Sequence, residues 1–142
     1  MTREQRILRL NAFIVSVPFG IFFAAAAWPP LYEVWRIFFA VAHWPFNAAP
    51  AELDATGRLL VAIGGGLGAG LGAMTWAVAT YVLPVAPTAG RRVIWVSVLT
   101  WFVTDSTFSV VAGSPMNALI NVGLMAMLVL PTLNQPADEQ FA

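Results

Sequence analysis

Four long apolar runs, separated by shorter polar or proline-bearing segments, dominate the chain. About 20 helical residues cross the roughly 30 Å hydrocarbon layer of a bilayer, and each run is near that length. None alternates with the two-residue period of a barrel strand, so backbone hydrogen bonding in lipid requires helices. The pattern predicts an all-α membrane protein, a four-transmembrane-helix bundle that forms a single domain over residues 1–142. The predicted spans are Leu10–Ala27, Leu59–Leu83, Val93–Ala112 and Met116–Leu133.

The connection between the first two runs is the longest and is rich in aromatic residues. Two prolines end the first run, and the segment Leu31–Trp44 that follows is too short to span a bilayer. Aromatic side chains favour the headgroup level, and the polar residues of this segment share one helical face. We expect an amphipathic helix in the membrane interface; the alternative is an irregular aromatic loop folded over the bundle. Its expected interfacial residues are Trp35, Arg36, His43 and Trp44.

Local signals predict how the helices begin, bend and turn. Pro18 removes a backbone amide from the first span, which predicts a bend in mid-membrane. Asp54 or Thr56 is placed to cap the second span. The tripeptide Gly113–Pro115 makes a very tight turn, so the last two spans should form an antiparallel hairpin.

Charged residues are few and balanced. The chain is 59% hydrophobic and 10% charged, against about 25% charged in a soluble domain. Its 7 basic residues match its 7 acidic residues, so no basic field indicates a nucleic-acid partner. The partners expected are membrane lipids and other membrane proteins.

The arginines are distributed unequally between the two ends of the spans. By the positive-inside rule, the end with more arginines faces the cytoplasm, which predicts that both termini are cytoplasmic. We interpret the first run as a retained signal-anchor helix rather than a cleaved signal peptide. Arg3, Arg6, Arg9, Arg91 and Arg92 lie at the predicted cytoplasmic end, and Arg36 and Arg58 at the other.

Glycines recur in the second run at two overlapping four-residue spacings. Gly64, Gly68 and Gly72 share one helical face, and Gly66 and Gly70 share another. Faces without side chains let a neighbouring backbone approach closely, so we expect tight helix packing there. The pattern leaves open whether the glycines contact this chain's own helices, a second copy or another subunit.

Asp105 is the only acidic residue inside a predicted span, where a charge costs about 2.5–3.5 kcal/mol on the insertion scale. We expect it to face the bundle interior and to be protonated, hydrogen-bonded or both. Hairpin geometry places it level with Asn121, with Asn117 one turn away. The alternatives are a polar ligand pocket and interhelical contacts worth about 0.6–2 kcal/mol each. The third run adds a polar stripe of Ser97, Thr100, Thr104 and Thr107.

The sequence contains few residues that could form a haem site, a metal site or a catalytic site. His43 is the only histidine and Cys is absent, so paired-histidine haem sites and thiolate metal sites have no ligands within one chain. A single imidazole ligating a pigment is the alternative to a surface histidine beside Trp44. No catalytic arrangement is found, so the sequence predicts no enzyme, no metal and no cofactor. Contact with a lipid, a quinone or a pigment stays open.

Three features resemble a broad set of small bacterial four-helix membrane proteins, loosely similar to the DoxX-like group. They are Leu8–Ala12 opening the first span, the glycine-rich second span, and Asp105-Ser106 inside the third. The resemblance implies a helical bundle in the bacterial inner membrane and no catalytic residues. The aromatic segment and the Asn117/Asn121 pair have no match in it.

Two functional hypotheses follow. The first is a non-catalytic accessory or structural subunit of a larger membrane assembly, such as a photosynthetic or respiratory complex, or a homo-oligomer. The second is a carrier or binder of a small apolar or protonatable molecule at a polar site around Asp105. An intramembrane enzyme would need a bound cofactor. A cavity that reaches Asp105 would distinguish the second hypothesis from the first.

Overall fold

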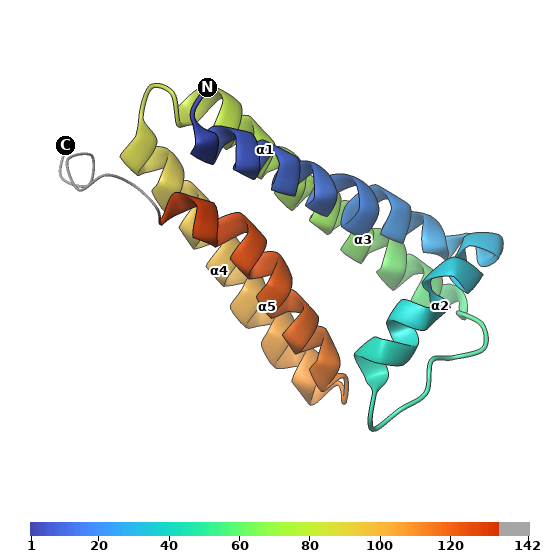
Figure 1. Ribbon diagram of the computed structural model, residues 1–142. Helices are drawn as coiled ribbons and strands as arrows, with labels where there is room; N and C mark the ends of the chain where they lie inside the picture. The colour runs from blue at the N-terminus through green and yellow to red at the C-terminus, as the bar shows by residue number, and fades with distance from the viewer. Residues whose placement is uncertain (134–142) are drawn as a thin grey trace.

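The computed structural model describes residues 1–133, and its regular elements in this range are all helices (Figure 1). Four helical stretches are long and apolar enough to cross a membrane, so the chain is a multi-pass membrane protein of the predicted class. The elements are α1 Arg3–Ser16, the π-helix η1 Val17–Phe22, the 3-10 helix η2 Ala25–Ala27, α2 Pro29–His43, α3 Ala55–Ala77, the π-helix η3 Val78–Val82, α4 Pro87–Val111, α5 Pro115–Val129 and the 3-10 helix η4 Leu130–Thr132.

Each span begins earlier than its apolar run, because the helices extend through their polar ends to residues that start a helix. Thr2 forms a capping box with Gln5 at the start of α1. Asp54, one of the two predicted caps, accepts from the Gly57 amide at 2.6 Å at the start of α3. Prolines occupy the first turns of α2, α4 and α5, where a missing amide costs nothing.

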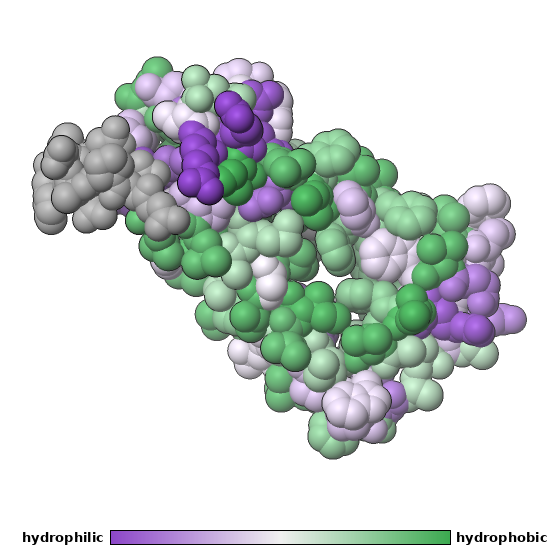
Figure 2. Space-filling model, in the orientation of Figure 1, coloured by the Kyte–Doolittle hydropathy of each residue, from purple (hydrophilic) through white to green (hydrophobic). Residues whose placement is uncertain are grey.

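The four spans form two antiparallel pairs, α1 with α3 and α4 with α5. The pairs lie close together at the end that holds the N-terminus and the α3–α4 connection, and they diverge towards the end that holds α2 (Figure 1). Hydrophobic surface covers most of the length of the helices, with hydrophilic residues near the N-terminus and at the α2 end (Figure 2). The prediction that the C-terminus is cytoplasmic concerns residues outside the described range.

Small residues bring the first pair together. A Cβ atom at Gly65 would lie 2.4 Å from the backbone nitrogen of Ala24, and one at Gly72 would lie 2.6 Å from the backbone of α1. Gly20, on η1, is approached as closely by the backbone of α3. These distances are far below a van der Waals contact, so this packing excludes any side chain at the three glycines. Gly65 and Gly72 of α3 therefore contact this chain's own first span.

The two pairs are joined at their narrow end by a buried ion pair. Arg91, on α4, donates through Nε and one terminal nitrogen to the two carboxylate oxygens of Glu4, on α1, at 3.0 Å each. Nearby, the Asn11 side chain donates to the Met127 carbonyl of α5 at 2.6 Å. The apolar core lies at the same end and comprises Leu8, Val15, Val78, Ala79, Leu83, Ile94, Val98, Leu128 and Val129.

The wide end is bridged by α2, a helix as predicted, so the alternative of an irregular aromatic loop is wrong. Its C-terminal residue His43 places Nδ1 2.6 Å from Ser114 Oγ in the α4–α5 turn. Close by, the Asn47 side chain donates to the Gly113 carbonyl at 3.2 Å. This end of α2 is thereby attached to the second pair, while its other end contacts η2 of the first span.

Aromatic rings hold α2 against the first span. Trp35 Nε1 donates to the Phe22 carbonyl at 3.1 Å, and its ring meets the Phe23 ring edge-on at a centroid distance of 5.1 Å. About one turn nearer the start of α2, the Tyr32 hydroxyl donates to the Pro50 carbonyl at 2.5 Å. Burial raises the pKa of the Tyr32 phenol, so the hydroxyl keeps the proton that it donates.

The irregularity expected at Pro18 takes the form of a π-helix. Val17–Phe22 departs from α-helical hydrogen bonding around this proline, which has no amide to donate. The break places Gly20 against α3 and directs the following aromatic residues towards α2. The proline thus positions the wall of the space between the helix pairs.

Candidate functional site

A cavity of about 890 Å³ lies between the two helix pairs. Both pairs contribute to its walls, and Phe38 of α2 lines its wide end. This volume falls within the range of about 300–1,000 Å³ typical of small-molecule sites. The other lining residues are Val15, Phe19, Phe23, Gly64, Leu67, Gly68, Leu71, Met74, Val96, Ser97, Thr100, Trp101, Thr104, Asp105, Phe108, Asn117, Ile120, Asn121 and Leu124.

One wall of the cavity carries a hydrogen-bonded cluster centred on Asp105. The Asn121 side chain donates to Asp105 Oδ2 at 2.5 Å, which is the contact that the hairpin geometry predicts. Asn117 donates to the same oxygen at 3.4 Å. The two amides also donate to Ser106 Oγ at 3.2 Å and to Ser109 Oγ at 2.8 Å, respectively. The cluster ties α4 to α5 and fixes the orientation of the carboxyl group.

The two oxygens of Asp105 differ in their surroundings. Oδ2 receives both amide donors, whereas no hydrogen bond from the described residues reaches Oδ1. No buried polar side-chain atom of the described chain lacks a hydrogen-bond partner, so Oδ1 is not sealed inside the protein. A bound molecule in the cavity therefore has an oriented acceptor available to it.

Some of the other polar residues predicted near Asp105 line the cavity, and others lie outside it. Thr104 lines the cavity together with Ser97 and Thr100, but Thr107 lies outside it. Sequence reasoning missed Ser106 and Ser109, which accept from the asparagines. The position of Ser109, four residues after Asp105, was a usable signal, because side chains at this spacing are neighbours on the helix surface; the adjacent residue Ser106 carries no such signal.

The predicted packing glycines also occupy different environments. Gly64 and Gly68 line the cavity, and Gly72 packs against α1. A Cβ atom added at Gly66 or Gly70 would meet no atom of another element within 4 Å among residues 1–133. Gly65, which the sequence interpretation omitted, makes the closest approach to the first span.

The four predicted interfacial residues lie on or beside α2. Trp35 is half-buried against the first span, and Trp44 is exposed. His43 is half-buried on Ser114 rather than free at the surface.

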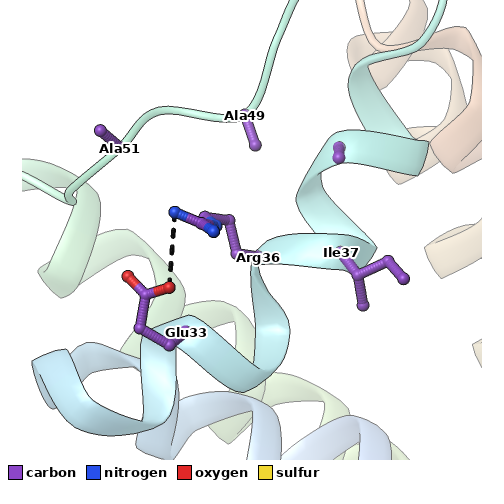
Figure 3. Close-up of a pocket in the computed structure, with 6 residues that line it drawn as sticks. Glu33, Arg36, Ile37, Ala49 and Ala51 are labelled. Atoms are coloured by element: carbon purple, nitrogen blue, oxygen red, sulfur yellow. Dashed lines mark ion pairs between the residues drawn. The ribbon is translucent and has the colours of Figure 1, made fainter.

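A second pocket, of about 530 Å³, lies between α2 and the loop that leads to α3. Glu33 and Arg36 point towards each other beneath the loop residues Ala49 and Ala51 (Figure 3), and their charged atoms are 3.4 Å apart. Because this exposed pair neutralises itself, the pocket presents no uncompensated charge. It also lies outside the spans, so it is a weaker candidate for a ligand site.

Within residues 1–133, no group of three or more His, Cys, Asp or Glu side chains lies close enough together to hold a metal ion. The chain matches no known protein family, no curated protein and no solved structure.

Proposed function

We propose that this protein binds a small amphipathic molecule in the cavity at Asp105, as a binder or carrier in the bacterial inner membrane. One observation carries the proposal: a cavity of about 890 Å³ between two helix pairs reaches a carboxyl group that has one oxygen without a partner among the described residues. The proposed role is binding rather than catalysis.

The wall composition supports an amphipathic ligand rather than a fully polar one. Aliphatic and aromatic side chains form most of the lining, and polar side chains gather on α4 and α5. Ligand sites are commonly apolar with a few placed polar groups that fix orientation. An apolar body would contact the first helix pair while a polar head meets Asp105.

A purely structural role explains less of this arrangement. Interhelical hydrogen bonding requires only that Asp105, Asn117 and Asn121 satisfy one another, which the contacts between α4 and α5 already achieve. Packing alone would favour filling the space between the pairs, because membrane helices associate largely through dispersion contacts. Instead α2 holds the wide end of the cavity open by contacting both pairs.

Photolabelling tests the proposal. The protein is placed in phosphatidylcholine nanodiscs with a long-chain alcohol that carries a diazirine beside its hydroxyl group. We expect saturable labelling of cavity residues such as Asn121 and Ile120, and linear, unsaturable labelling of Leu119 on the outer surface. Mass spectrometry of the labelled peptides measures both.

Paired phenylalanine variants locate the labelled site. Thr100→Phe/Thr104→Phe places two rings in the cavity and should abolish saturable labelling. Leu99→Phe/Val103→Phe adds rings with the same spacing on exposed positions of α4 that do not line the cavity, and should leave labelling unchanged. Linear labelling at every position of the wild-type protein would refute the proposal.

A further inference from the structure

The hydrogen-bond donors around Asp105 are already used within the protein. Each asparagine amide has two N–H donors. Asn117 directs its donors to Asp105 and Ser109, and Asn121 directs its donors to Asp105 and Ser106. The amide nitrogens therefore have no donor left for a ligand.

Acceptors, by contrast, remain available at the same place. Asp105 Oδ1 and the amide oxygens of Asn117 and Asn121 receive no hydrogen bond from the described residues. The hydroxyl groups of Thr100 and Thr104 serve as donors or acceptors, so they favour neither kind of ligand. A ligand head that donates hydrogen bonds fits this wall, whereas a head with acceptors alone, such as a quinone carbonyl, does not.

The charges of the cavity favour the same kind of ligand. Asp105 is the only ionisable residue among the described residues that line the cavity, and these include no Arg or His to offset a carboxylate. In a space bounded by apolar side chains, an opposite charge is strongly attracted and a like charge is strongly repelled. A carboxylate or phosphate head is therefore disfavoured beside Asp105.

Aromatic rings around the cavity suit a cation as well. Phe23 and Phe38 line the cavity from the first span and α2, and Trp101 and Phe108 line it from α4. Ring faces attract cations through their quadrupole, and Trp does so most strongly. The rings also accept the apolar body of a ligand.

We infer that the ligand is a lipophilic amine in its protonated form, whose ammonium group donates to Asp105 Oδ1 while its apolar part lies among the aromatic rings. This inference rests on the proposed function and narrows it to one class of ligand. It sets the sign of the head group's charge and the direction of its hydrogen bonds.

Competition for the diazirine alcohol site tests the inference with three molecules that share one alkyl chain. Dodecylammonium, dodecanol and dodecanoate are added at equal bilayer mole fractions at neutral pH, in nanodiscs of zwitterionic lipid. We expect dodecylammonium to displace the probe about tenfold more effectively than dodecanol, because hydrogen bonds between charged groups are the stronger class. Dodecanoate should displace it least.

Two charge-removing variants assign the preference to Asp105. In Asp105→Asn, the advantage of dodecylammonium over dodecanol should disappear while the neutral probe still labels the cavity saturably. Glu33→Gln removes the same charge from the exposed surface of α2 and should leave the advantage intact. Saturable labelling without a preference for dodecylammonium, or a preference that survives in Asp105→Asn, would overturn the inference and leave the proposed function standing. Absence of saturable labelling in the wild-type protein would refute the proposed function itself.

Discussion

Gly65→Ala is expected to destabilise the protein by about 1–3 kcal/mol, although alanine is a better helix former than glycine. The new methyl group would lie 2.4 Å from the Ala24 nitrogen and 2.6 Å from its Cα atom. Both are backbone atoms, so relief requires α1 and α3 to separate along their contact. Titration of the purified protein with sodium dodecyl sulphate, followed by circular dichroism, measures the change in unfolding free energy.

The adjacent glycine provides a matched control. A Cβ atom at Gly66 would meet no other element of the described chain within 4 Å, so Gly66→Ala should leave stability unchanged or raise it by up to about 1 kcal/mol through helix propensity. The two variants make the same chemical change one residue apart on the same helix. Equal effects of the two substitutions would contradict the described packing of α3 against the first span.

Arg91→Met is expected to cost about 3–5 kcal/mol, the range for breaking a buried ion pair from one side. The Arg91 and Glu4 side chains are only 13% and 8% exposed, so removing the guanidinium leaves a carboxylate with little access to water. The double variant Glu4→Gln/Arg91→Met should recover part of the loss, because it removes both charges. The same detergent titration gives the coupling energy from a double-mutant cycle.

An exposed ion pair serves as the control for this cycle. Arg36→Met breaks the pair with Glu33 on the surface of α2, where an exposed pair contributes only about 0–1 kcal/mol. If Arg91→Met lowers the free energy of unfolding no more than Arg36→Met does, the Glu4–Arg91 pair does not hold the narrow end together.

The spans and the hairpin were predictable because their signals are local and strong. Runs of apolar residues define the four crossings, and a tight turn ending at Pro115 fixes the register of α4 against α5. That register predicts the contact between Asp105 and Asn121, since equal distances from a turn lie level in an antiparallel pair. The helix cap at Asp54 was predictable because it, too, is a local signal.

The glycine face was harder to predict because a four-residue spacing does not follow an α-helix. Each step of four residues drifts by about 40° around the axis, so Gly64, Gly68 and Gly72 do not stay on one line. The face that meets the first span instead alternates steps of four and three residues, through Gly65 and Gly72. The glycine content predicts that this helix packs closely against a neighbour. Only the period of the α-helix shows which of its faces makes the contact.

The features that define the cavity depend on contacts between distant segments. Glu4 and Arg91 lie in different helix pairs, and His43 meets Ser114 across the wide end. Neither contact follows from local sequence, because the angle between the pairs determines which residues meet. The sequence could therefore predict the polar residues around Asp105, but not the cavity beside them, because the cavity depends on the position of α2 between the two pairs. The association with other subunits through glycine faces stays a prediction.

The most direct measurement is the distance between an amine nitrogen and the Asp105 carboxyl carbon. Solid-state NMR of the protein in lipid, with carbon-13 in its aspartate carboxyls and nitrogen-15 in dodecylammonium, detects their dipolar coupling. Binding at Asp105 predicts dephasing that corresponds to about 3.5 Å, since a charge-assisted hydrogen bond holds nitrogen and oxygen about 2.8 Å apart. Subtracting the signal of Asp105→Asn isolates this carboxyl. Dephasing that is absent, or that persists in Asp105→Asn, would contradict a ligand site at Asp105.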